Sequence, residues 1–143
     1  MRSCRFVFAV HVLAVLATRQ PSSCSSIALA QTVNTNPVVI RRLLIDLQAA
    51  GLIGTIRGPR GGAYLAMPPD QITLFEVRCA VDPPTAFGLH PQSPAPSCPV
   101  GGRIRAVMKQ VQDQVLGAME RELTGITLAD VVCRLQACAD PRP

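Results

Sequence analysis

The stretch TNPVVIRRLLIDLQAAGLIGTIRGPRGGAYLA, residues 35–66, contains the pattern that decides the fold. Asn36 is a suitable helix N-cap, and Pro37 fits the first helical position, where its missing N–H costs nothing. Apolar residues then recur with the i, i+3, i+4, i+7 spacing of a buried helix stripe: Ile40, Leu43, Leu44 and Leu47. The spacing predicts a helix over residues 37–50, which Gly51 ends.

The face of this helix opposite the stripe is basic near its start. With about 100° of rotation per residue, Val38, Arg41, Arg42 and Ile45 point away from the buried side. The N-terminal part of a DNA recognition helix is the part that meets base edges in the major groove. The pattern is consistent with a recognition helix, although two exposed arginines alone are usually a solvated helix face.

A basic hairpin is predicted directly after this helix. Two β-rich runs, 52–57 and 63–66, flank the sequence GPRGG. Its glycines, at positions 58, 61 and 62, are expected to supply positive φ angles, and a proline stiffens the loop. The hairpin carries Arg57 and Arg60 and no acidic residue. Together with the preceding helix it predicts a winged helix-turn-helix, whose wing arginines reach phosphates or an adjacent minor groove.

The N-terminal segment has two interpretations. Residues 4–18 fit a largely buried first helix, and Ser25 or Ser26 can cap a short second helix over 26–32 before the turn VNTN. The apolar run RFVFAVHVLAVLA, 5–17, with Arg2 before it and a possible cut after Ala30, also fits a secretory signal peptide. A histidine inside the run and the long segment before the supposed cut oppose that second interpretation.

The C-terminal half predicts two capped helices. In ITLFEV, residues 72–77, Thr73 and Glu76 have the spacing of a capping box. Thr127 and Asp130 repeat this device in ITLADV, residues 126–131. Between these segments, residues 82–99 are rich in proline and serine and predict a loop.

A long helix is predicted over residues 100–122. Its apolar seam consists of Ile104, Met108, Val111, Val115 and Met119. A lone helix cannot hide such a seam, so it packs on its own domain or on a partner, and a homodimer is favoured because it also supplies two recognition helices. The expected division is a DNA-binding domain at 1–81, a loop at 82–99, and at 100–143 a dimerisation helix with a C-terminal helix that packs back on the head.

The charge is unevenly distributed. The chain has a formal net charge of +5, and residues 1–71 carry all of this excess, with seven arginines against Asp46 and Asp70. A localised basic excess indicates a polyanionic partner, most often nucleic acid, although ordinary surface charge is the alternative. The two histidines are isolated and the acids are scattered, so no catalytic site is predicted and the chain is not expected to be an enzyme. No apolar run reaches the roughly 18 residues of a membrane span, so no membrane partner is expected.

Three motifs now combine in order: residues 35–66, ITLFEV with the following AV, and CPVGGRI at 98–104. Together they resemble the Rrf2 family of bacterial transcription regulators, the family of IscR, NsrR and CymR, over residues 4–135. The resemblance implies a mainly α fold with a small β-hairpin wing, dimerised through the long helix. It also assigns 5–17 to the first helix of the domain. The expected function is that of a cytoplasmic, homodimeric, sequence-specific DNA-binding regulator, a repressor on a palindromic operator.

Positions that contact DNA in the family are implied to fall on Asn36, Val38, Arg41, Arg42 and, in the wing, Arg57. The full expected DNA-binding set is Ser26, Thr35, Asn36, Val38, Arg41, Arg42, Arg57 and Arg60. Arginine suits guanine edges or phosphate, and the sequence does not decide which of these arginines reads bases.

Many family members hold an iron–sulfur cluster through three cysteines in the loop before the dimerisation helix. In this loop only Cys98 is present, and Gln92 and Ala86 stand six and twelve positions before it. Neither residue is a thiolate, which such clusters require. The chain is therefore expected to bind no metal and no cofactor, as in the cluster-free branch of the family.

Two further hypotheses concern the six cysteines. Cys98 precedes the long helix, where a helix N-terminus lowers the pKa of a thiol, and some cluster-free relatives are thiol switches with disulfides between subunits. The first alternative is a regulator gated by Cys98 that senses thiol redox state, with Cys24 as the partner of Cys98, or, as a less favoured version, senses through an iron–sulfur cluster. A secreted disulfide-linked protein with a signal peptide is the second alternative. Cys4, Cys79 and Cys133 are expected to be buried on apolar helix faces.

Overall fold

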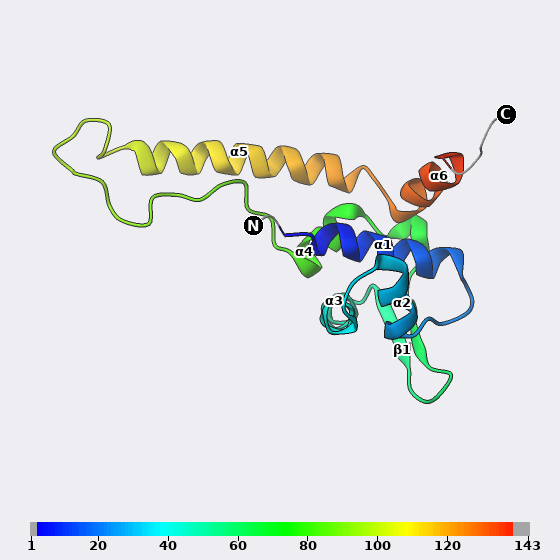
Figure 1. Cartoon of the computed structure of the whole chain (residues 1–143). Helices are drawn as coiled ribbons and strands as arrows, with labels where there is room; N and C mark the ends of the chain where they lie inside the picture. The colour runs from blue at the N-terminus through cyan, green and yellow to red at the C-terminus, as the bar shows by residue number, and fades with distance from the viewer. Residues whose placement is uncertain (1–2, 139–143) are drawn as a thin grey trace. The chain divides into compact units, whose positions relative to one another are not determined.

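The computed structural model describes residues 3–138 (Figure 1). Residues 1–2, which include Arg2, and residues 139–143 belong to the predicted domains but lie outside the described residues. The described chain forms two compact units. The head comprises residues 3–83 and 123–138, and the second unit comprises residues 84–122.

The head contains seven helical segments and one hairpin. In chain order these are α1 (Arg5–Thr18), α2 (Ser26–Val33), α3 (Pro37–Ala49), β1 (Ile53–Ile56), β2 (Gly62–Leu65), the 3-10 helix η1 (Pro69–Gln71), α4 (Leu74–Val81), the last residues of α5 (Ile104–Thr124) and α6 (Leu128–Cys138). The prediction of a mainly α fold with a small β-hairpin is confirmed, since the only sheet among residues 3–138 has two strands.

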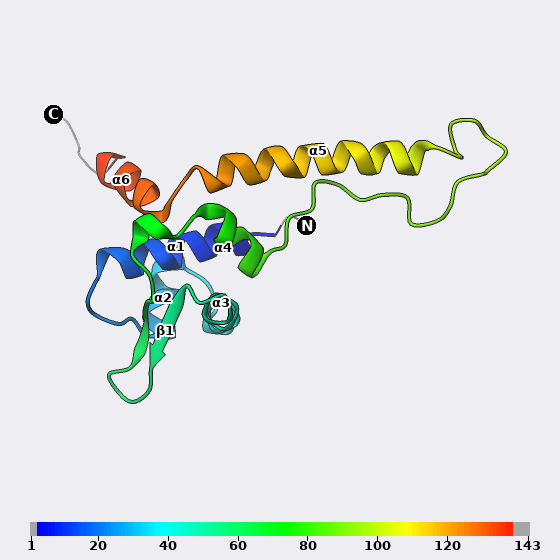
Figure 2. The same ribbon diagram turned by 180° about the vertical axis from the view of Figure 1, so that it is seen from behind.

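Helix α1 forms the centre of the head. It packs against α2, α3 and β2 as well as against α4 and α6. Views from the front and from behind both show α6 on the opposite side of α1 from the hairpin (Figure 1, Figure 2). Val12, Leu13 and Leu16 are almost fully buried in its core. Burial of each such side chain contributes about 1.5–3 kcal/mol, so the segment that also fits a signal peptide is an integral part of the fold.

Helix α3 forms as its sequence predicts. The side-chain oxygen of Asn36 accepts a hydrogen bond from the backbone N–H of Val38 at 2.9 Å, and Pro37 occupies the first turn. The buried residues of the helix are those of the predicted stripe: Ile40, Leu43, Leu44 and Leu47. The stripe fixes which face of α3 remains available to a partner.

The hairpin agrees with the prediction in its strands and differs in its loop. β1 and β2 pair antiparallel, with Ile53 opposite Leu65 and Ile56 opposite Gly62. Gly58 has the expected positive φ of 110°, whereas the predicted positive φ at Gly61 and Gly62 is wrong. Close approach of backbone explains these two glycines, since a Cβ on Gly62 would overlap the carbonyl of Cys24 and one on Gly61 the carbonyl of Ile56.

An isolated bridge attaches the hairpin to the start of α2. The N–H of Cys24 donates to the carbonyl of Ala63 at 2.9 Å, and the N–H of Ala63 donates to the carbonyl of Cys24 at 2.8 Å. Ser25 then caps α2, its hydroxyl accepting from the N–H of Ala28 at 3.1 Å. The bridge fixes the N-terminus of α2 beside the wing.

Both predicted capping boxes are present. At the start of α4, the N–H of Glu76 donates to the Thr73 hydroxyl at 3.2 Å and the N–H of Thr73 donates to the Glu76 carboxylate at 3.0 Å. Thr127 and Asp130 make the same two bonds at the start of α6, at 3.1 and 2.9 Å. The two caps also meet, because Thr73 and Thr127 form an antiparallel bridge that joins the starts of α4 and α6.

The second unit consists of a long loop and α5. Gln112 donates to the carbonyl of Phe87 at 2.7 Å, and Arg105 donates to the carbonyl of His90 at 3.0 Å, so the loop is attached to its own helix. None of the residues of α5 is buried, and Val111 and Val115 in its seam are 38% and 41% exposed. The apolar seam of α5 is therefore only partly covered, since Ile104, Met108 and Met119 are half-buried and Val111 and Val115 are exposed.

Candidate nucleic-acid interface

The predicted DNA-binding residues lie on α2 and α3, in the turn between these helices and in the hairpin, all on one side of α1 (Figure 1). Four of them are arginines, and all four are exposed: Arg41, Arg42, Arg57 and Arg60. None of the ion pairs formed among residues 3–138 involves these arginines. No described acidic side chain therefore neutralises their guanidinium groups. Arginine can bind phosphate or a guanine edge through two parallel hydrogen bonds.

A groove of about 350 Å³ joins α3 to the wing. Ser26 at the first position of α2, Arg41 of α3 and Thr55 of β1 all line it. The backbone N–H groups of a helix N-terminus carry partial positive charge, which matches the charge of Arg41. The structure thus brings together Ser26 and Arg41, two of the predicted residues, while the groove does not include Arg42.

The remaining predicted residues differ in how accessible they are. Val38 is 45% exposed at the start of α3. Asn36 is exposed, and because its side-chain oxygen caps the helix, only its amide N–H groups remain free to donate. Thr35 is half-buried, and its backbone N–H donates to the carbonyl of Ala30 at 3.0 Å. Arg57 and Arg60 lie at the hairpin loop, at the far end of the wing from the core.

Apolar side chains accompany the arginines on this side of the head. Ile45 on α3 is 66% exposed and Ile56 on β1 is 55% exposed. Such groups contact thymine methyls in protein–DNA interfaces. The helical rotation predicted the outward direction of Ile45, whereas nothing in the sequence singled out Ile56.

One contact of α3 had no signal in the sequence. Arg5 of α1 forms an ion pair with Asp46 of α3 and donates through Nε to the carbonyl of Val81 at 2.9 Å. The three residues are distant in sequence and meet only in the folded head. Arg5 therefore connects α1, α3 and the end of α4.

The cysteines differ in part from the prediction. Cys98 is exposed, and hydrogen bonds from the backbone N–H groups of Gly101 and Val100 lower the pKa of its thiol. Cys24 is buried, at 4% exposure. The prediction that Cys4, Cys79 and Cys133 are buried is wrong, because all three are exposed. Cys4 lies just before α1, and Cys79 and Cys133 lie on exposed faces of α4 and α6.

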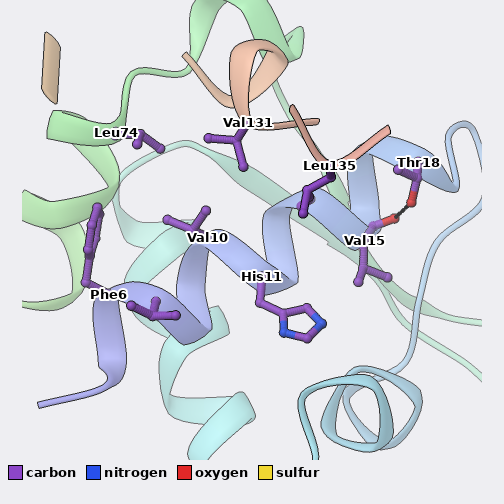
Figure 3. Close-up of a pocket in the computed structure, with 10 residues that line it drawn as sticks. Phe6, Val10, His11, Val15, Thr18, Leu74, Val131 and Leu135 are labelled. Atoms are coloured by element: carbon purple, nitrogen blue, oxygen red, sulfur yellow. Dashed lines mark hydrogen bonds between the residues drawn. The ribbon is translucent and has the colours of Figure 1, made fainter. Parts of the chain in front are cut away.

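A second groove, of about 460 Å³, lies between α1, α4 and α6 (Figure 3). Its walls are almost entirely apolar and include Phe6, Val10, Val15, Leu74, Val131 and Leu135. Because α4 and α6 are not among the elements that carry the predicted DNA-binding residues, this groove is separate from the candidate interface. None of the helices among residues 3–138 has the length and hydrophobicity needed to cross a membrane.

Comparison with known proteins gives a consistent assignment. The sequence model of the Rrf2 family, described as an iron-dependent transcriptional regulator, matches residues 2–134. YwnA of Bacillus subtilis strain 168, provisionally named an HTH-type transcriptional regulator, is 37% identical over 136 residues, which cover 94% of this chain and 99% of YwnA.

Two solved structures are similar along nearly their whole length. One is a provisionally assigned DNA-binding protein with 35% identity and a TM-score of 0.73, which covers 89% of this chain and 97% of its own. The other is IscR of T. potens, with 22% identity and a TM-score of 0.75, covering 100% of this chain and 93% of IscR. The second likeness concerns the fold alone.

The iron in the family description has no matching donor set in this chain. Within residues 3–138, no three side chains among histidine, cysteine, aspartate and glutamate are grouped so that they could hold a metal ion. The loop that precedes α5 supplies a single thiol, whereas an iron–sulfur cluster requires several soft ligands. The residues present therefore do not fit a cluster. On the match over residues 2–134 and the shared fold, this chain belongs to the Rrf2 family of transcriptional regulators.

Proposed function

We propose that the protein is a sequence-specific DNA-binding transcription regulator that acts as a homodimer on a palindromic operator. The observation that carries this proposal is the set of four exposed arginines on α3 and the hairpin, none of which is in an ion pair among residues 3–138. In this arrangement the start of α3 enters the major groove, and the wing arginines contact phosphates or the neighbouring minor groove.

The seam of α5 supports the homodimer. A partly exposed seam of this kind is stabilised by packing against an identical helix, and a two-fold axis then repeats the recognition helix. Two recognition helices about 34–36 Å apart read half-sites on the same side of a duplex. We assign the protein as a cytoplasmic repressor, because a dimer that covers its operator excludes other proteins from the same DNA.

Selection of bound DNA from a random pool tests this function. The expected result is a palindromic consensus whose half-sites are about one helical turn apart. Binding to this consensus should weaken steeply with salt, because each phosphate contact contributes about −0.9 to the slope of log affinity against log salt concentration. The double variant Arg57→Gln/Arg60→Gln should bind less tightly with a shallower slope.

A matched control removes two arginines from α5 and α6, Arg121→Gln/Arg134→Gln, and should leave the salt slope unchanged. Recovery of no enriched sequence from the pool, or equal losses in both double variants, would contradict the proposal. Intact-mass measurement on the protein purified from its natural host tests the secreted alternative. Retention of the segment that forms α1 is expected, because its removal would leave the core of the head exposed.

A second candidate function is a thiol-gated regulator, favoured by one observation. Cys98 is exposed, and its lowered pKa increases the fraction of reactive thiolate near neutral pH. Burial of Cys24 means that a disulfide between these two cysteines would require the segment before α2 to open. Another thiol is therefore the more accessible partner for Cys98.

A further inference from the structure

Asp46 has an unusual position in the charge pattern of the head. It is the only acidic residue among the first 69 residues, and it lies on the recognition helix itself. Arg42 stands four residues before it, one helical turn away. Side chains four positions apart on a helix are neighbours, and opposite charges at this spacing form ion pairs. Asp46 is therefore the natural partner for Arg42.

The structure gives Asp46 a different partner. Its carboxylate pairs with the guanidinium of Arg5, which reaches it from α1. The Nε of the same guanidinium donates to the carbonyl of Val81 at 2.9 Å, so two directions of the planar group are fixed at once. The side chains of Arg5 and Asp46 are only 35% and 40% exposed, which limits their screening by solvent.

We infer that Arg5 is a positioning residue for DNA binding, because it holds Asp46 and so leaves Arg42 unpaired for the nucleic acid. Arg5 also neutralises the only negative charge on α3, which would repel phosphates. The inference rests on the proposed DNA-binding function. On this inference, Arg5 of α1 does not touch the nucleic acid itself. It assists the contact that Arg42 makes on the exposed face of α3.

The competing explanation is that Arg5 merely ties α1, α3 and α4 together. The two explanations differ in what happens when Asp46 is neutralised. In Arg5→Gln, the released Asp46 turns to Arg42, so operator affinity should fall roughly two- to fivefold, as the strength of an exposed ion pair implies. The salt slope should become shallower by about 0.9, the contribution of one phosphate contact.

In Arg5→Gln/Asp46→Asn no carboxylate remains to capture Arg42, so affinity and slope should return to the values of the unaltered chain. If Arg5→Gln weakened operator binding by loosening the packing of α1, α3 and α4, the second substitution would not restore the affinity. Arg42→Gln should show the shallower slope by itself, and adding Arg5→Gln to it should produce no further change in slope. Arg134→Gln on α6 removes the same charge on the opposite side of α1 from the hairpin, and should leave the slope unchanged (Figure 1).

The experiment measures operator binding at several salt concentrations, with circular dichroism melting of each variant as the test of folding. A double variant as weak as Arg5→Gln, or an Arg134→Gln variant that loses as much, would overturn the inference. If Arg5→Gln does not fold, Asp46→Asn tests the inference. Affinity and slope that both stay unchanged although the ion pair is lost support it. A fall in affinity, which a mere tie between the helices predicts, or a slope steeper by about 0.9, which would mean that Arg42 had been paired with Asp46, would overturn it. Failure of the unaltered chain to bind any selected DNA would overturn the proposed function, and the inference with it.

Discussion

The ring of Tyr64 lies over Gly54, its cross-strand partner in the hairpin. A Cβ at position 54 would overlap the outer end of the ring, so the absence of a side chain there allows the ring to cover the strand. Tyr64 is 39% exposed and stands on the face of the hairpin that does not enter the core. An aromatic ring over a glycine stabilises a two-stranded sheet that has little other cover on that face.

Alanine substitutions at Gly54 and Gly62 should differ in their effects on stability. At Gly54 the obstacle is the end of a movable ring, so the loss should be about 1 kcal/mol or less. At Gly62 the obstacle is the backbone of Cys24 and Ser25, and we expect a loss of about 2–3 kcal/mol together with weaker DNA binding. Urea unfolding measures both. Gly88→Ala, where nothing lies within 4 Å of the added carbon, is the control, and equal losses at Gly54 and Gly62 would refute the argument.

Val111→Glu should convert the protein to a monomer. The substitution places a charge in the α5 seam, where dimerisation would desolvate it without a partner. Light scattering coupled to gel filtration should show half the mass, and operator affinity should fall because two half-sites are no longer bound together. Gln114→Glu adds the same charge to an exposed position of the same helix and should remain dimeric. If the Val111→Glu protein remained dimeric, the seam of α5 would not be the dimer interface.

Asp130 should make stability depend on acid pH. Hydrogen bonds from the backbone N–H and the hydroxyl of Thr127, with a smaller effect of Arg134, lower the pKa of the Asp130 carboxyl in the folded state. The stabilisation is therefore present above the unfolded-state pKa of about 3.9 and is lost as the pH falls through the lower folded-state value. Urea unfolding of Asp130→Asn should show a smaller loss of stability between about pH 6 and about pH 3 than the unaltered chain. Parallel curves for the two proteins would contradict this.

Cys98 should be the most reactive exposed cysteine at neutral pH. Its lowered pKa increases the thiolate fraction, so iodoacetamide should label it before Cys133, as mapped by mass spectrometry of digests. In the thiol-gated alternative, a mild oxidant weakens operator binding, Cys98→Ser removes the response and Cys133→Ser retains it. An unchanged oxidant response in Cys98→Ser would exclude Cys98 as the gate.

Local patterns predicted most of the fold. The stripe of α3, its cap at Asn36 and the capping boxes at Thr73 and Thr127 all appear as expected, because each depends on residues within one or two helical turns. Exposure of the basic face of α3 follows from the same periodicity. The glycines of the wing show the limit of such reasoning, since Gly62 is required by the backbone of a distant segment and not by its own φ angle.

Features that depend on tertiary contacts were not predictable. The pairing of Arg5 with Asp46 joins residues 41 positions apart, and no local rule connects them. The prediction that three of the cysteines are buried was wrong for a related reason. Periodicity shows which face of a helix is apolar, but not whether another element covers that face. Cys133 lies on such an uncovered face of α6.

The bridge between Thr73 and Thr127 joins the two parts of the head that residues 84–122 separate in the sequence. The N–H of Leu74 donates to the carbonyl of Ile126 at 2.9 Å, and the N–H of Leu128 donates to the carbonyl of Ile72 at 2.8 Å. The chain segments before and after residues 84–122 are therefore hydrogen-bonded to each other. In the proposed dimer, changes of length within residues 84–122 would alter the distance between the two heads without altering how each head binds its half-site. On this proposal, the spacing between half-sites and the recognition of bases would be separate, independently adjustable properties of the protein.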